Sequence, residues 1–182
     1  MKKDEEKELL RQFRNPKTSN AAFEAIVRSF QEKLYWHIRN MVSSHDDADD
    51  ILQNVFVKSW RSLENFRGDS GLYTWLYRIA TNECLSFLAK KKPNIDISQA
   101  EIATDFPISR EEESHQSGDA IQKKLEQAIS LLPNKQKAVF NLRYYEEMKY
   151  NEIAEIMGTS VGALKASYHH AVKKIETFIK ED

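Results

Sequence analysis

The segment YNEIAEIMGTSVGAL, residues 150–164, decides how the carboxy-terminal part of this chain folds. Small Ala154 is followed four positions later by Gly158 and six positions after that by apolar Leu164. Ala154 allows two helices to cross closely, and Gly158 permits a sharp turn between them. Leu164 then fills the space between the helices together with Ile153 and Met157. This spacing predicts a helix-turn-helix, a unit whose second helix enters the major groove of DNA.

The helix that follows the turn, predicted at 160–179, presents polar groups on its outer side. Lys165 and His170 can donate to base acceptors or phosphates, whereas Ala166 and the ring of His169 can contact thymine methyl groups. The alternative is a solvated helical face that touches nothing. Neighbouring histidines on a helix point about 100° apart and no third ligand is spaced to help, so no metal site is predicted. The predicted DNA-contacting residues are Lys165, Ala166, Ser167, His169, His170 and Lys173, with Lys174 beside them.

On the amino-terminal side of this segment, apolar residues recur at helical spacing through most of the chain. Pro133 ends one pattern and fits the opening turn of the next, and Ser70 is a suitable N-cap. The carboxy-terminal helices are predicted at 120–131, 134–145, 150–157 and 160–179. The amino-terminal helices are predicted at 20–43, 46–62 and 71–90, with a short helix at 4–14 before them. The apolar residues of the three longer helices, Trp60 at the end of the second included, are predicted to form a compact core.

Residues 93–119 lack this periodicity and contain Pro93, Pro107 and Gly118, so they are interpreted as a linker. Residues 93–120 carry a net charge of −6, whereas residues 1–20, 21–92 and 121–182 carry +2, +1 and +2. The weakly basic blocks can approach DNA, and the acidic linker is repelled by it or mimics it in a basic channel.

Composition favours an all-α protein of two small helical domains, residues 1–92 and 120–182, joined by a flexible acidic linker. The 182 residues are 41% hydrophobic and 30% charged, with five Gly and four Pro. Cys84 stands alone and excludes an internal disulfide, which suits a reducing compartment. The charged amino terminus and the lack of an apolar run of ~18 residues predict a cytoplasmic protein that is not an integral membrane protein.

Three stretches resemble the extracytoplasmic-function (ECF) sigma factors of the sigma-70 family. DADDILQNVFVKSW (47–60) and FRGDSGLYTWLYRIATN (66–82) are similar to region 2, and LLPNKQKAVF (131–140) with the helix-turn-helix is similar to region 4. The likeness covers residues 20–92 and 120–178. It implies a subunit that directs core RNA polymerase to promoters by minus-35 binding and minus-10 melting.

The resemblance also implies two contacts with core polymerase. An acidic region 2 helix docks on the β′ clamp helices, and its polar side carries Asp47, Asp50, Gln53 and Lys58. An acidic cluster that only complements the helix dipole is the alternative for Asp46 and Asp47. Region 4 grips the β flap tip with an apolar surface that can equally be domain core: Leu132, Val139, Phe140, Leu142 and Tyr144.

In the family, one minus-10 base is flipped into a pocket of region 2. Such a pocket needs apolar or stacking walls and a polar group that reads the base edge. Phe66, Ile79 and Asn82 match these positions, and the Asn82 amide can both donate and accept. Phe66, Trp75 and Ile79 are alternatively core residues. Strand phosphates would be held by Arg67, Arg78, Lys90, Lys91 and Lys92.

Other functions explain less of the sequence. A sigma-like decoy or adaptor need not retain Phe66, Asn82 and the basic run 90–92, and a plain helix-turn-helix repressor leaves residues 46–92 unexplained. Cys84 has no His or Asp partner at an interpretable spacing, and no phosphate-binding glycine loop is present. We therefore predict no catalytic residue, no enzyme activity, no cofactor and no small-molecule substrate. An anti-sigma factor that covers the DNA-binding faces is a partner that the resemblance implies.

Overall fold

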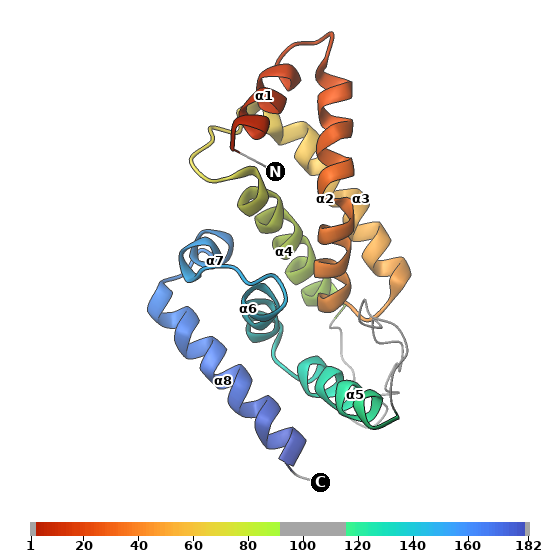
Figure 1. The fold of residues 1–182 in the computed structure, drawn as a ribbon, viewed down its shortest axis with the longest axis vertical. Coiled ribbons are helices and arrows are strands. Elements are labelled where there is room, and N and C mark those ends of the chain that lie inside the picture. Colours follow the sequence, from red (N-terminus) through yellow and green to blue (C-terminus); the bar gives the residue numbers. More distant parts are fainter. Residues whose placement is uncertain (1–2, 92–115, 181–182) are drawn as a thin grey trace.

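The structure, a computed structural model, describes residues 3–91 and 116–180, and every regular element in these ranges is a helix (Figure 1). This confirms the predicted all-α class. The helices agree with the predicted ranges to within a few residues, with α5 starting four residues earlier than predicted. They are α1 (Lys3–Phe13), α2 (Ser19–Met41), α3 (His45–Ser62), the 3₁₀ turn η1 (Leu63–Asn65), α4 (Leu72–Lys90), α5 (Gln116–Ser130), α6 (Asn134–Tyr144), α7 (Tyr150–Met157) and α8 (Val161–Lys180). Most of the predicted linker, residues 93–115, lies outside the described residues.

The amino-terminal group is built on α2, which packs against α1, α3 and α4 (Figure 1). Ile26, Phe30, Leu34 and Ile38 recur every four residues along α2 and are all buried. That spacing puts them on one side of the helix, where each buried side chain stabilises the fold by about 1.5–3 kcal/mol. The periodicity that predicted the helix therefore also identified the face that forms the core.

The start of α4 differs from the prediction. Ser70 was expected to cap it, but α4 begins at Leu72 with Gly71 at the N-cap position and no side-chain cap from that residue. The Leu72 N–H instead donates to the Glu6 carboxylate at 2.8 Å, from α1. The first N–H groups of a helix have no partner within the helix and favour negative charge, so a carboxylate from another helix satisfies them.

The carboxy-terminal group confirms the predicted helix-turn-helix. Gly158 adopts a left-handed φ of 61° and its N–H donates to the Ala154 carbonyl at 2.9 Å, which ends α7. Ser160 accepts a hydrogen bond from the Ala163 N–H at 3.3 Å at the start of α8. Leu164 is buried as predicted. A second apolar core joins α5, α6 and α8 through Ala128, Ile129, Leu132, Phe140, Ala171 and Ile175.

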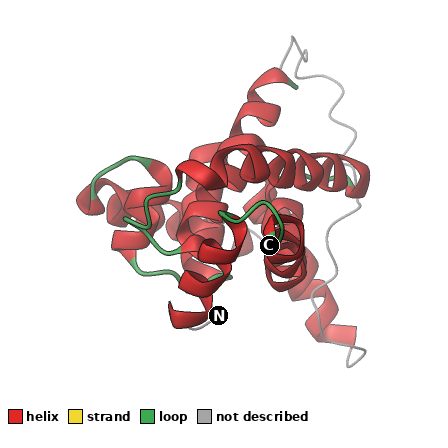
Figure 2. Cartoon of the chain, turned by 90° about the horizontal axis from the view of Figure 1, so that it is seen from above, coloured by secondary structure: helices red, strands yellow, loops and turns green. Residues whose placement is uncertain are grey.

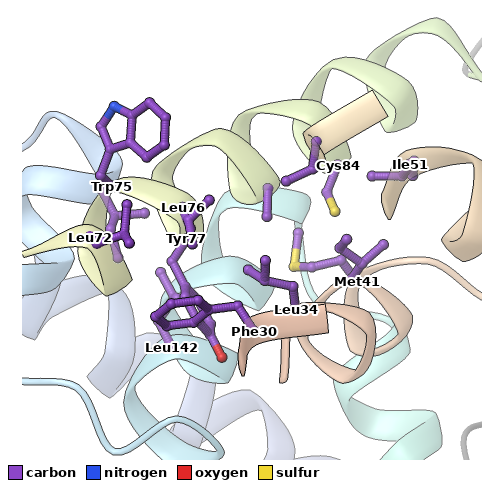
Figure 3. Packing of buried hydrophobic residues seen from close by; sticks show 14 of the residues in the cluster. Phe30, Leu34, Met41, Ile51, Leu72, Trp75, Leu76, Tyr77, Cys84 and Leu142 are labelled. Carbon is purple, nitrogen blue, oxygen red and sulfur yellow. The ribbon is translucent and has the colours of Figure 1, made fainter. Parts of the chain in front are cut away.

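The two groups of helices touch each other. α7 lies against α4, and α6 lies against α2 and α4 (Figure 1). Figure 2 shows the helices of the chain from above. Leu142 of α6 is buried in the same apolar cluster as Phe30 of α2 and Tyr77 of α4 (Figure 3). Ile153 and Ile156 of α7 belong to this cluster too. One apolar core therefore crosses the boundary between the two predicted domains.

Polar groups of α6 also cap the end of α2. The Asn141 amide donates to the Asn40 carbonyl at 3.1 Å, and the Lys137 ammonium group donates to the Met41 carbonyl at 3.3 Å. The last carbonyls of a helix lack partners within the helix and favour positive charge. Burial nevertheless lowers the pKa of Lys137 from 10.5 to about 8, because it disfavours the charged form. The hydrogen bond to the Met41 carbonyl therefore comes with a desolvation cost for the charged Lys137 ammonium group.

We expect Lys137→Met to remove part of the pH dependence of folding. Unfolded Lys137 keeps its proton up to a pKa of 10.5, whereas the folded chain releases it near pH 8. Between these values the unfolded state binds more protons, so this residue makes stability rise with pH. From pH 8 to pH 9 the wild type should gain about 1 kcal/mol relative to the variant.

Urea unfolding at pH 7, 8 and 9 measures this difference. Burial raises the pKa of the Cys84 thiol, which acts in the opposite direction, but it does so in both proteins and cancels in the comparison. A constant difference from pH 8 to pH 9 would show that Lys137 stays charged in the folded protein.

Candidate nucleic-acid and polymerase interface

An open hollow lies where the loop after η1 meets the first half of α4. Arg67 and Arg78 are exposed at it, whereas Phe66 is buried with 6% of its surface exposed. The Phe66 ring packs on Trp75, which is buried as well, at a centroid distance of 5.1 Å. The hollow thus has an aromatic wall, and its charged lining consists of two arginines and two carboxylates. Its lining residues are Asn65, Phe66, Arg67, Asp69, Ser70, Trp75, Arg78 and Glu155.

The other predicted minus-10 residues lie farther along α4. Asn82 is exposed one turn after Arg78 and therefore shares its face, whereas Ile79 is partly buried against the main core. Lys90 is exposed, twelve residues or roughly 18 Å beyond Arg78 on the helix axis. Lys92 lies outside the described residues. The structure therefore gathers Phe66, Arg67 and Arg78 at one hollow, with Asn82 nearby and the basic run at the far end of α4.

The predicted polymerase-binding residues line α3. Asp50, Gln53 and Lys58 are exposed and Asp47 is half-buried. Asp47 pairs with Lys91 at 2.6 Å, and Lys58 forms an ion pair with Glu83. These exposed pairs contribute at most about 1 kcal/mol each. Lys91 was predicted to bind DNA and Asp47 to bind polymerase, yet the two side chains pair with each other. Their separation in the sequence gave no sign of this contact.

Two apolar side chains on α3 were not singled out by the sequence as surface residues. Val57 is 48% exposed and Trp60 is 39% exposed. The Trp60 ring packs edge-on against Phe13 and Phe23, at centroid distances of 5.1 and 5.0 Å, yet keeps one edge in solvent. The helical pattern predicted Trp60 as a core residue. Its three-dimensional position at the rim of the α1–α2–α3 cluster leaves it available to a partner.

The outer side of α8 carries the predicted minus-35 residues. Lys165, Ala166, His169, His170 and Lys173 are exposed, and Ser167 is partly buried. The Lys165 ammonium group lies 5.8 Å from the Tyr150 ring centroid, a cation–π distance. Lys174 donates to Gln136 at 3.1 Å. In residues 3–91 and 116–180 no three His, Cys, Asp or Glu side chains are grouped as metal ligands would be.

The apolar residues assigned to the flap-tip contact divide into two sets. Leu132, Val139, Phe140 and Leu142 are buried, so they form core in this structure. Tyr144 is exposed, and two side chains that the sequence did not single out, Leu131 and Tyr145, are exposed as well. The Phe140 ring stacks on Tyr144 at 5.1 Å, which ties the exposed aromatic edge to the core.

Comparison with known proteins identifies the fold and the function. The model of Sigma-70 region 2 matches residues 26–93, and the model of Sigma-70, region 4 matches residues 122–175. The RNA polymerase sigma-H factor of Pseudomonas aeruginosa is 32% identical over 163 residues, 85% of this chain and 84% of that protein. The ECF RNA polymerase sigma-E factor of Haemophilus influenzae is 33% identical over 168 residues, 87% of this chain and 88% of that protein.

One solved structure shows the same fold. The sigma factor RpoE of Bartonella quintana, in complex with the anti-sigma factor NepR, superposes with a TM-score of 0.67 at 24% identity, covering 88% of this chain and 98% of that one. The chain belongs to the ECF sigma factors of the sigma-70 family. It is therefore a promoter-specificity subunit of RNA polymerase that initiates transcription. No helix in the described part of the chain has the length and apolarity to cross a membrane.

Proposed function

We propose that this sigma factor opens promoters by holding an unstacked minus-10 base in the hollow beside Phe66. The observation that carries the proposal is the convergence of Phe66, Arg67 and Arg78 at one hollow, with Asn82 exposed on the same face of α4. Unstacking a base costs a few kcal/mol, which an aromatic wall and two arginines can offset. Arg67 and Arg78 would hold phosphates, and Asn82 would read the base edge.

The remaining contacts follow from the exposed surfaces. Core polymerase would bind the polar side of α3, at Asp47, Asp50, Gln53 and Lys58, through its β′ clamp helices. Val57 and Trp60 add apolar area to that side, and aromatic anchors strengthen protein interfaces. Region 4 would meet the β flap tip through exposed apolar groups such as Tyr144. The face of α8 from Lys165 to Lys173 would read the minus-35 element in a major groove.

The protein would act in the cytoplasm, where polymerase and chromosome are, and would catalyse no reaction of its own. An anti-sigma factor is proposed as a partner because a protein of the same fold, RpoE, was solved in complex with one. Such a partner would regulate access to the DNA-contacting faces.

The expected result of Asn82→Ala is a loss of transcription of about ten-fold or more, with altered minus-10 preference. A base-edge hydrogen-bond pair provides about 1–3 kcal/mol of discrimination. Run-off transcription with purified core polymerase on a promoter library measures it. Asn20→Ala is the matched control, because Asn20 is exposed at the start of α2, away from the hollow, and should leave transcription unchanged.

The same assay separates the alternatives. Polymerase binding without transcripts from any promoter would favour a decoy or adaptor. Equal transcription by wild type and Asn82→Ala would remove Asn82 from the reading site.

A further inference from the structure

We propose that the Lys137 side chain reacts reversibly with dissolved carbon dioxide and forms a carbamate in a small cavity at the carboxyl end of α2. Residues of α2, α5 and α6 line this cavity, and it shares no residue with the hollow beside Phe66. The proposal therefore does not depend on the minus-10 site. It makes Lys137, described above only as a cap of α2, a site of covalent modification.

The cavity has the size and the access that a triatomic molecule needs. Its volume is about 30 Å³, which exceeds the roughly 10–15 Å³ that one water molecule needs. Ser43 and Ser130 of its lining are exposed, whereas Arg39 and Asn141 are buried. Carbon dioxide can therefore enter past the two serines and reach the polar groups at the inner end.

Lys137 lines the cavity and supplies the nucleophile, because a carbamate forms only from a neutral amine. Burial lowers the pKa of Lys137 from 10.5 to about 8; the Arg39 guanidinium also lowers it, whereas Cys84 acts in the opposite direction. At pH 8 about half of the Lys137 side chains are then neutral. An ordinary lysine with a pKa of 10.5 is neutral in only about 0.3% of molecules at that pH.

The groups around the cavity can stabilise the negative charge that the reaction creates. Arg39 is held in place there, because its Nη1 donates to the Val42 carbonyl at 3.0 Å. A buried carboxylate needs a nearby cation and hydrogen-bond donors, which Arg39 and the Ser43 and Tyr145 hydroxyls can supply. Glu126 also lines the cavity and opposes the carbamate, so the Arg39 charge is essential to the balance.

Asn141 offers an acceptor for the hydrogen that stays on the carbamate nitrogen. Its amide nitrogen donates to the Asn40 carbonyl at 3.1 Å, whereas its Oδ1 atom is buried without a hydrogen-bond partner among the described residues. A buried acceptor without a donor is costly. Lys137 and Asn141 are four residues apart on α6 and share a face, so the carbamate N–H can donate to Oδ1.

The reaction needs no oxidant, metal or cofactor. The Nζ lone pair of neutral Lys137 attacks the carbon of carbon dioxide, and an N–C bond forms while one C=O electron pair moves to oxygen. Nζ then releases one proton to solvent. The product is a carbamate with one N–H and one negative charge, and protonation of its nitrogen releases carbon dioxide again.

Carbon-13 NMR of the full chain in ¹³C-labelled bicarbonate buffer at pH 8 tests the proposal. Lys137→Met removes the reactive amine. Lys135→Met is the matched control, because Lys135 is an exposed lysine on the same helix. The chain's α-amino group also forms a carbamate, and its signal serves as an internal reference in every sample. Alkylation with a trialkyloxonium salt traps carbamates as esters, and peptide mass spectrometry then locates them.

We expect a second carbamate signal in the wild type and in Lys135→Met, and its complete loss in Lys137→Met. Trapping should place that signal on Lys137. Arg39→Gln should lower its occupancy about ten-fold, because the buried carbamate would lose its cation. Circular dichroism reports whether each variant keeps its helices. If Lys137→Met loses them, Lys137→Arg replaces it, because arginine keeps a cation near the Met41 carbonyl and stays protonated.

Three outcomes would overturn the proposal. A carbamate on the α-amino group alone would show that Lys137 does not react in the folded chain. Trapped esters spread evenly over Lys135, Lys137 and other lysines would show that the cavity confers no selectivity. Equal occupancy in the wild type and in a folded Arg39→Gln variant would show that the cavity does not stabilise the product.

Discussion

Phe66→Ala is expected to lower the free energy of unfolding by about 3–5 kcal/mol, the usual cost of removing a buried aromatic ring. Phe66 is 6% exposed, its ring packs on Trp75 at 5.1 Å, and its carbonyl accepts a hydrogen bond from Arg14 at 3.4 Å. The truncated side chain would leave a cavity under the hollow. Urea unfolding followed by circular dichroism measures the loss.

Phe66→Leu separates the structural role of this ring from its proposed role in DNA binding. Leucine preserves most of the apolar volume, so this change should cost less than about 1.5 kcal/mol of stability. It removes the aromatic face, and stacking of a base on that face is worth about 1–3 kcal/mol. Promoter opening by Phe66→Leu should therefore fall about ten-fold or more. Unchanged transcription would leave Phe66 as a core residue that only supports the hollow.

Leu142→Ala is expected to cost about 3–4 kcal/mol of stability and to weaken the contact between the two domains. Leu142 lies on α6, is 0% exposed, and belongs to the apolar cluster that contains Phe30 and Tyr77 (Figure 3). We expect the wild type to unfold in one transition, because one apolar core joins the two domains, and Leu142→Ala to unfold in two, because the domains then unfold separately. Differential scanning calorimetry measures both effects.

Leu131→Ala is the matched control for Leu142→Ala. This variant makes the same Leu-to-Ala change at a side chain that is 68% exposed. It should therefore lower the free energy of unfolding by no more than about 0.5 kcal/mol. A loss below about 1 kcal/mol in Leu142→Ala would show that the side chain contributes little across the boundary between the domains.

Much of the candidate site was accessible from the sequence because the signals are local. Phe66, Arg67 and Arg78 were predicted together, and the structure does place them at one hollow. Phe66 and Trp75 were left open between pocket and core, and the structure buries both. Trp60 was predicted as a core residue, but it is 39% exposed at the edge of its cluster. The spacing of apolar residues along α3 identifies the side of the helix that faces the core, but not which of these residues lie at the edge of the core.

The sequence by itself determined the helices, the helix-turn-helix and the family. A 3.6-residue period, Pro133 at a helix start and Gly158 at a turn act through neighbouring residues only. Tertiary structure alone decided the contacts between distant residues. Glu6 caps α4 from 66 positions away, Asn141 caps α2 from 101 positions away, and Glu155 reaches the hollow of the other domain. These contacts depend on how the helices pack, because a partner is chosen by proximity in space and by the need to satisfy buried polar groups.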